Sequence, residues 1–271
     1  MRKIFTTGSL IISFIVLLSH SSKAQYVIKE ADDQYYLFNY TKAIDLYSQA
    51  YKKHATLHAA EQLANCYRLT HDYKNAESWY AIAVGMPESK PENILKYAEA
   101  LQNNSKYSEA KEQYKAYQAL NTEVDAGLIK RRILSCDSSV KWMKDPVWVN
   151  IINEKSLNTI QSDWGLSKNG DSMVFTSDRV NTKEVSAPKK KPFLKFDGGD
   201  IEPSSTVYGW TGKNYLRLYQ LEGGNAKLFP FDPGTNYHVG AATFTADGKE
   251  MYFTLTKYRA KRWRIKKVQK P

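Results

Sequence analysis

Four sets of residues recur every 33 or 34 positions in the first half of the chain, and this period constrains the fold more than any other feature. Each unit carries an alanine, a tyrosine nine residues later, a second alanine three residues on and a second tyrosine four residues further. The three units contain Ala31, Tyr40, Ala43 and Tyr47; Ala64, Tyr73, Ala76 and Tyr80; and Ala98, Tyr107, Ala110 and Tyr114. A period of this length predicts pairs of helices that stack on their neighbours. Alanines let such helices approach closely, and aromatic rings fill the grooves between them.

The first tyrosine of each unit follows a short polar turn, written "LFNY", "THDY" and "NSKY". The recurring Y-x-x-A-x-x-x-Y pattern resembles the tetratricopeptide repeat. Ala50 and Ala83 occupy its next small position, whereas the third unit has Tyr117 there and the characteristic early Trp is missing. The resemblance implies a right-handed helical solenoid of three repeats over residues 25–120. The alternative is a plain helical bundle with fortuitous tyrosines.

The segment that follows the repeats reads as one more helix. Residues 121–146 include "VDAGLIKRRILSCDSSVKWMKDP", with apolar residues at Leu128, Ile129, Ile133, Leu134 and Val140. We expect this helix to cap the open end of the stack, as solenoids require.

The first 24 residues have the layout of a secretory signal peptide. Arg2 and Lys3 precede an apolar run over residues 10–18, and small residues follow up to Ala24. The run is too short for a membrane span, which needs about 20 residues. We therefore expect cleavage after Ala24 and an exported protein of the periplasm or the periplasmic face of the outer membrane. The alternative is an amphipathic first helix of the domain.

Charge and cysteine content narrow the possible partners. Removal of Arg2, Lys3 and Lys23 would lower the formal net charge from +11 to +8. A basic surplus suits nucleic acid, anionic lipid or an acidic polymer, and export argues against nucleic acid. Cys66 and Cys136 are too few for a disulfide framework, and we expect buried free thiols rather than a bridge.

From Val147 onward the chain changes to short β-rich runs separated by glycine turns. "GLSKNGDSMVFTSD" at residues 165–178 and "TFTADGKEMYFTLT" at residues 243–256 are closely similar. Each carries Asn-Gly or Asp-Gly, the strongest short signal for a β-hairpin. "NYLRLYQLEGGNAKLFPFD" predicts another hairpin, which turns at Gly223-Gly224.

These two strings resemble the blade motif of TolB-like (WD40-like) β-propellers. The resemblance implies that the string repeats because blades repeat, and that the aromatic residue after each turn, Phe175 or Phe253, packs between blades. One blade takes about 40–45 residues and a propeller needs at least about four blades. Residues 147–271 therefore predict an incomplete propeller, with an insertion around "KEVSAPKKKPFLKFDGGD". We expect the N-terminal part of a longer protein, or a truncated gene product.

The expected fold class is multidomain, α then β: a tetratricopeptide-like solenoid followed by partial propeller blades. This order resembles outer-membrane-associated OmpA-family proteins of Bacteroidetes-type bacteria, some of which serve type IX secretion. The resemblance implies a non-enzymatic scaffold that holds an envelope protein or peptide in its solenoid groove, with indirect association with peptidoglycan or the outer membrane. The alternative is the propeller region of an exported hydrolase whose catalytic domain lies beyond residue 271.

Catalytic, metal-binding and cofactor-binding patterns are missing from the sequence. His54 and His58 lie four apart without a third ligand, and "GLSKNG" differs in spacing from the G-x-S-x-G nucleophile motif. We therefore predict no catalytic residue, no metal site and no cofactor.

Two sets of residues are candidates for binding. Tyr36, Tyr67 and Tyr97 are candidate partner anchors, because aromatic residues dominate interfaces, although a role in helix packing is the favoured alternative. The basic residues of "RWRIKK" form the second set: Arg262, Arg264, Lys266 and Lys267. We favour a charged edge strand there over a patch that binds anionic envelope polymers.

Overall fold

The structure is a computed structural model of the chain that describes residues 26–120, 126–179, 204, 206–231, 233–234 and 236–257. The chain divides into two compact units between Trp148 and Val149. The expected signal peptide and the basic set Arg262, Arg264, Lys266 and Lys267 lie outside the described residues.

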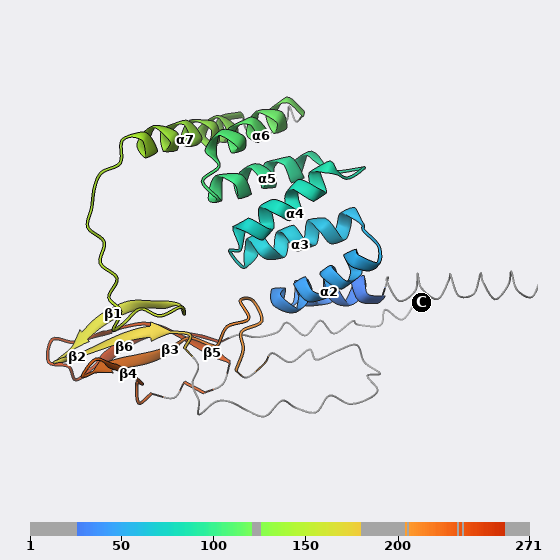
Figure 1. Cartoon of the computed structure of the whole chain (residues 1–271). Helices are drawn as coiled ribbons and strands as arrows, with labels where there is room; N and C mark the ends of the chain where they lie inside the picture. The colour runs from blue at the N-terminus through green and yellow to red at the C-terminus, as the bar shows by residue number, and fades with distance from the viewer. Residues whose placement is uncertain are drawn as a thin grey trace, which may run out of the picture. The chain divides into compact units, whose positions relative to one another are not determined.

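The first unit is a stack of helices in which each one packs against the next along the chain (Figure 1). Residues 26–36 are helical and precede the six remaining helices. These are α2 (Tyr40–Lys53), α3 (Leu57–Leu69), α4 (Tyr73–Gly85), α5 (Pro91–Asn103), α6 (Tyr107–Leu120) and α7 (Ala126–Lys144). The prediction of three stacked helical hairpins and a further helix is confirmed.

The repeated alanines and second tyrosines are the core of this stack. All nine side chains are fully buried: Ala31, Ala43, Tyr47, Ala64, Ala76, Tyr80, Ala98, Ala110 and Tyr114. The third unit replaces the next small residue by Tyr117, whose ring packs in a cluster with Ile129 and Cys136 of α7. The larger side chain of Tyr117 therefore packs against the last helix, α7, which covers the end of the third pair.

The turn inside each helix pair has one geometry, repeated three times. Phe38, His71 and Ser105 have φ of 58°, 62° and 61°, the left-handed region that glycine ordinarily occupies at helix ends. The next residue in each turn donates its backbone N–H to the carbonyl five residues back, at 2.9 Å in all three cases. This bond closes the first helix of the pair and places the following tyrosine at the start of the second.

Local capping fixes where the helices of the middle pair begin. The Thr56 hydroxyl accepts a hydrogen bond from the Ala59 N–H at 3.2 Å, and the Asp72 carboxylate accepts one from the Asn75 N–H at 3.2 Å. Each bond satisfies a backbone donor that has no partner within its own helix. Helix α5 instead begins with Pro91, which needs no such partner.

The second unit consists of two antiparallel sheets. The four-stranded sheet has the order β1-β2-β3-β4, and the two-stranded sheet pairs β5 with β6. The strands are β1 (Asp163–Asn169), β2 (Ser172–Ser177), β3 (Arg217–Glu222), β4 (Asn225–Leu228), β5 (Tyr237–Phe244) and β6 (Met251–Lys257). All three predicted hairpins are present, at the Asn-Gly, Gly-Gly and Asp-Gly turns.

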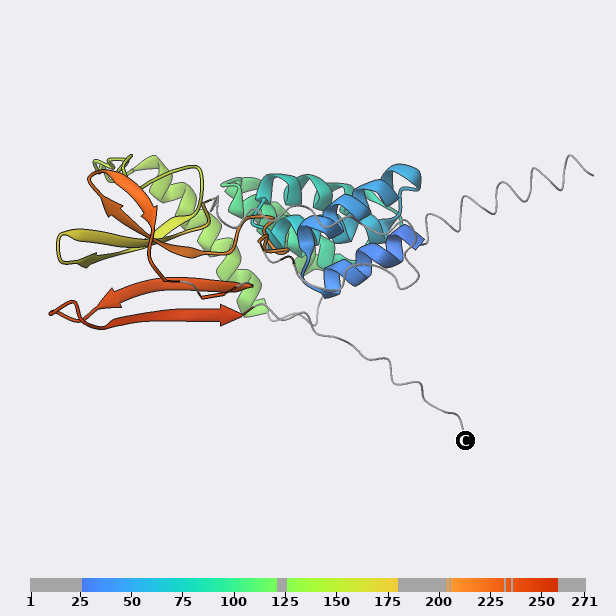
Figure 2. The ribbon, with the colours of Figure 1, turned by 90° about the horizontal axis from the view of Figure 1, so that it is seen from below.

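The two sheets lie face to face, as Figure 2 shows for the red β5–β6 hairpin beside the four-stranded sheet. Val174 and Leu218 meet Val239 and Ala242 in a buried cluster between them. Phenylalanines from both layers surround this cluster, including Phe253. The repeated string therefore marks two hairpins that stack on one another.

Phe175 and Phe253 occupy equivalent positions in the repeated string but pack differently. Phe253 packs between the sheets as expected, but Phe175 lies on the opposite face of its own sheet from Val174. There its ring stacks on Tyr219 of the neighbouring strand, with ring centroids 6.0 Å apart. Phe175 therefore does not pack between the two described sheets.

The described strands form no closed ring of blades, because the sheets of four and two strands are separate and open at their edges. Cys66 and Cys136 are buried free thiols, in agreement with the favoured expectation. Among the described residues, no helix is both long and apolar enough to cross a membrane.

Candidate functional site

The three buried tyrosines point their hydroxyl groups at the first helix of their own pair. Tyr47 donates to Asp32 Oδ1 at 2.5 Å, and Tyr80 donates to Asn65 Oδ1 at 2.9 Å. Tyr114 donates to Gln102 Oε1 at 2.7 Å. Burial raises the pKa of all three hydroxyls, that of Tyr80 to about 12, so each stays protonated and remains a donor. The rings therefore pack the core while their hydroxyls hold polar side chains in place.

Asn65 stands at the centre of a cluster that joins two successive pairs. Its Oδ1 accepts from Tyr80 and also from Lys96 Nζ of α5, at 3.2 Å. Arg68, one turn further along α3, donates its Nε–H to the Tyr80 hydroxyl at 3.2 Å. Two cationic side chains from different helices thus share the Asn65–Tyr80 pair, and we call these four residues the Arg68–Lys96 cluster.

The charge of the Arg68–Lys96 cluster is not balanced by a direct ion pair. Both cations are partly buried, and no carboxylate of the described residues lies within 4.0 Å of either one. Burial lowers the pKa of Lys96, and the neighbouring charge of Arg68 lowers it further, while Glu61, Glu99 and Glu92 act in the opposite direction. An anionic group placed here would gain two charge-assisted contacts.

Other polar bridges join the first helices of successive pairs. Asp32 lies 2.8 Å from His58 Nε2, and Glu61 accepts from Asn93 Nδ2 at 2.6 Å. Further along, Arg132 of α7 pairs with Glu99 at 3.4 Å. These carboxylates already have partners, which sets the Arg68–Lys96 cluster apart from its neighbours in this row.

The candidate tyrosine anchors occupy different environments. Tyr36 is 73% exposed and meets the ring of Tyr35 edge-on. Tyr67 and Tyr97 are partly buried against the cluster that contains Ala64 and Tyr80. The structure gives these two rings a packing contact between helices and does not bring the three tyrosines into one cluster.

Sequence reasoning missed the Arg68–Lys96 cluster, although a signal for part of it was present. Each repeated alanine of a first helix is followed directly by a polar residue, namely Asp32, Asn65 or Glu99. Asp32 and Asn65 each accept a hydrogen bond from the tyrosine of their own pair and also contact the next pair, through His58 and Lys96. Lys96 lies two residues before Ala98, where the first unit has Lys29 and the second has Gln62, and its approach to Asn65 appears only once the pairs are stacked.

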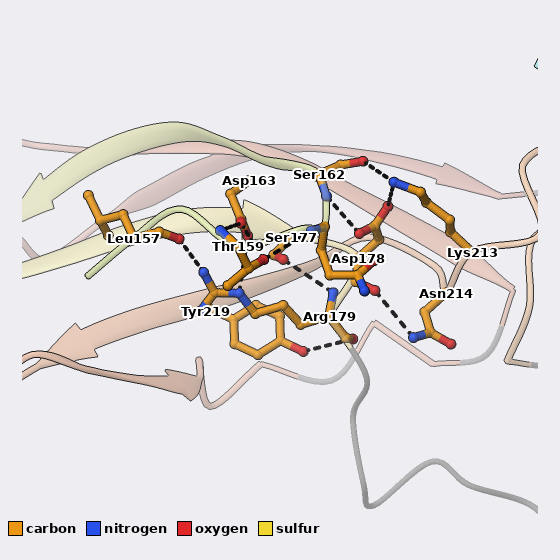
Figure 3. Close-up of polar contacts among 11 residues, drawn as sticks. Leu157, Thr159, Ser162, Asp163, Ser177, Asp178, Arg179, Lys213, Asn214 and Tyr219 are labelled. Atoms are coloured by element: carbon orange, nitrogen blue, oxygen red, sulfur yellow. Dashed lines mark hydrogen bonds and ion pairs between the residues drawn. The ribbon is translucent and has the colours of Figure 1, made fainter. Parts of the chain in front are cut away.

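A second polar network lies in the β unit, where it ties the start of β1 to the end of β2 (Figure 3). Arg179 Nε donates to Asp163 Oδ1 at 3.1 Å, its Nη2 donates to the Leu157 carbonyl, and its guanidinium lies 4.8 Å from the centroid of the Phe175 ring. Burial raises the pKa of Asp163, but hydrogen bonds from Ser177, Thr159 and Arg179 outweigh it and leave that pKa below its usual value.

The neighbouring Asp178 completes the network. Its Oδ1 accepts from the Ser162 N–H at 2.8 Å, and its Oδ2 lies 3.5 Å from Lys213 Nζ (Figure 3). Its backbone carbonyl accepts from Asn214. The carboxylates of Asp163 and Asp178 both have partners within the fold, so this network ties the strands together.

The described residues, which include His54 and His58, contain no group of three His, Cys, Asp or Glu side chains placed to hold an ion. His238 in the β unit is partly buried, and its Nδ1 accepts from the Leu216 N–H at 3.2 Å. Burial and the nearby Arg217 lower the pKa of His238 to about 4.

The comparisons with known proteins bear on the helical unit. No family model matches the chain. No curated protein matches it either. Several solved structures are similar to part of it, and the three that follow are all at low identity.

The Sgt2 tetratricopeptide repeat domain from Aspergillus fumigatus is 17% identical, with a TM-score of 0.39, covering 49% of this chain and 89% of that one. The first tetratricopeptide repeat domain of Spaghetti (RPAP3), bound to the HSP90 peptide SRMEEVD, is 19% identical, with a TM-score of 0.40, covering 45% and 95%. The Yersinia enterocolitica type III secretion chaperone SycD, in complex with a peptide of the translocator YopD, is 18% identical, with a TM-score of 0.38, covering 46% and 96%.

Proposed function

We propose that this chain is a non-enzymatic protein-binding scaffold whose helical unit holds an extended peptide segment of a partner against its first helices. The observation that carries the proposal is the Arg68–Lys96 cluster, which offers two cations that no carboxylate of the described residues contacts directly. The bound segment would place an acidic side chain, or a terminal carboxylate, against Arg68 and Lys96.

The electrostatics of the cluster support this assignment. A partly buried cation that lacks a counter-charge costs free energy, and the lowered pKa of Lys96 reflects that cost. An incoming carboxylate would relieve it, and the planar guanidinium of Arg68 is well suited to carboxylate recognition. The hydroxyl of Tyr80 and the amide of Asn65 hold both cations in place before the partner arrives.

Export is the second element of the proposal. The basic head, apolar run and small residues before Gln25 support secretion to the periplasm or the periplasmic face of the outer membrane. The partner would then be an envelope protein. Mass spectrometry of the protein from the envelope fraction tests this: a mature chain that begins at Gln25 supports it, and an intact first residue Met1 contradicts it.

The finer assignment concerns the second unit. Two similar hairpins that stack face to face support part of a TolB-like propeller in an OmpA-family protein, with a role in a peptidoglycan-associated or type IX secretion assembly. Capture of the chain on purified peptidoglycan sacculi or on secretion components from an envelope extract would test that role.

Peptide binding is tested with two probes that differ only in charge. Fluorescence anisotropy compares the binding of a peptide that has one central glutamate with that of the same peptide carrying glutamine there. The comparison is repeated for a panel of such pairs with different flanking sequences. We expect preferential binding of the glutamate peptides, with the preference decreasing as salt is added. Equal binding of both probes by every panel member would overturn the proposal.

A matched pair of variants locates the site. Lys96→Gln removes the charge and keeps a donor for Asn65, so it should reduce the affinity for the glutamate peptides about tenfold. Lys74→Gln makes the same change at an exposed position of α4 and should leave binding unchanged. Equal loss in both variants would point to non-specific attraction by the basic surface.

A further inference from the structure

The segment between α7 and the second unit carries large apolar side chains that nothing in the described structure covers. Exposed fractions are 86% for Val147, 92% for Trp148, 67% for Val149, 85% for Ile151 and 80% for Ile152. An apolar patch of this density marks an interaction surface, because isolated exposed apolar residues are ordinary but contiguous ones are not.

The backbone of this segment is also without partners. Residues 147–152 form no helix or strand, and no hydrogen bond joins their backbone to the described parts of the chain. Four of the six residues are β-branched and one is Trp, the composition of a β-strand. If the segment were extended, Val147, Val149 and Ile151 would line one face, and Trp148 and Ile152 the other.

The second unit has a strand edge to which such a segment could add. Strand β6 pairs with β5 on one side, and its other edge has no partner strand among the described residues. A two-stranded sheet is only marginally stable, and an open edge is a template for a further strand. The seven residues of β6 are long enough to pair with all six residues of the segment.

We infer that residues 147–152 of one copy of this chain add as a strand to β6 of a second copy, and that the exchange is reciprocal. In a two-fold dimer each copy gives one strand and receives one. The same symmetric contact then pairs residues 147–152 and covers the open edge of β6 in both copies. A lipid surface or an unrelated peptide would satisfy only one of these two features. The dimer leaves the Arg68–Lys96 cluster out of the contact, so it is independent of the proposed peptide site.

Light scattering of the purified chain across a dilution series tests the exchange. The wild type should be a dimer that dissociates on dilution. Val149→Pro removes a backbone donor from the segment and should raise the dimer dissociation constant at least about tenfold. Val149→Thr keeps the donor and the β-branched shape and should remain a dimer. A wild type that is monomeric throughout, or a Val149→Pro chain that dimerises as well as the wild type, overturns the inference.

Mixing two defective chains gives an independent readout. Leu255→Lys places a charge in the middle of β6, a device that blocks strand addition, while leaving the segment intact. Alone, Leu255→Lys and Val149→Pro should both be monomers with native circular dichroism. Mixed together, the intact segment of the first should pair with the intact β6 of the second and restore a dimer. Failure of the mixture to associate overturns the inference, as does protection of the 147–152 amides from hydrogen exchange in a wild-type monomer.

Discussion

Gly165 of β1 lies directly against Ala241 of β5: a Cβ added to Gly165 would come within 2.8 Å of the Ala241 Cβ. Both residues lie where their strand register shifts, so the two sheets are in close contact at the bulges of their first strands. The turns of the two hairpins also lie side by side, since a Cβ on Gly248 would be 3.1 Å from Asn169 Oδ1.

We therefore predict that Gly165→Ala destabilises the second unit more than Gly170→Ala does. Both residues have positive φ, which costs an alanine about 1–2 kcal/mol, but Gly170 has open space around it. The contact with Ala241 should add about 1–3 kcal/mol of overpacking at Gly165. Urea unfolding followed by tryptophan fluorescence measures the difference, and equal effects of the two substitutions would contradict the close approach of the sheets.

The turn geometry predicts a stabilising substitution in the helical unit. Ser105 has φ of 61°, so Ser105→Gly should raise the free energy of unfolding by up to about 1 kcal/mol. Ser78→Gly makes the same change inside α4 and should lower it by about 0.5–1 kcal/mol. Thermal unfolding monitored by circular dichroism compares them, and a loss of stability in both would argue against the left-handed turn.

The hydroxyl of Tyr47 predicts a difference between two tyrosines of the same helix. Tyr47→Phe leaves the carboxylate of Asp32 without its buried donor and should cost about 1.5–3 kcal/mol. Tyr51→Phe should change the free energy of unfolding by less than about 0.5 kcal/mol, because that ring contributes an edge-on contact with Trp79. A comparable cost in both variants would show that ring packing, not the hydroxyl, dominates.

His238 predicts how the second unit responds to acid. Its pKa is lowered to about 4 in the folded chain, so the unfolded chain binds the additional proton first as the pH falls. The unit should therefore lose stability between about pH 6.5 and about pH 4. Partial exposure of the ring limits the loss to about 1–2 kcal/mol.

Urea midpoints at about pH 7 and about pH 5 test this, with His238→Asn as the control that keeps an acceptor for the Leu216 N–H. The variant should show a smaller decrease than the wild type over this range. An identical decrease in both would assign the pH dependence to other groups.

The helical unit was predictable because its period is carried by buried residues, the repeated alanines and tyrosines, whose size is set by helix packing. Ala43 and Ala76 are fully buried between packed helices, so their spacing reports the repeat directly. The turn residues Phe38, His71 and Ser105 share no chemistry, so the left-handed geometry they have in common was not visible in the sequence. Stacking and the backbone bond five residues back impose it.

The β hairpins were predictable from local turn chemistry, but their packing was not. Asn169-Gly170 and Asp247-Gly248 each act within one hairpin, whereas the contact of Gly165 with Ala241 joins residues 76 apart (241 − 165 = 76). The candidate site fails to show in the sequence for the same reason. Lys96 reaches Asn65 across 31 residues, through a stack whose spacing the sequence gives but whose individual side-chain contacts it does not.

The position of Phe253 between the sheets gives the β unit a polarity. The Phe253 face of the smaller sheet meets the Val174 face of the larger one, and in the repeated string Phe175 corresponds to Phe253 and Val174 to Tyr252. The contact is therefore heterologous: the front of one hairpin meets the back of the other. Its two outer surfaces are unlike, one bearing Phe175 and the other Tyr252. A further sheet that repeated this contact would join front to back, so the array would extend in one direction rather than close as a two-fold pair.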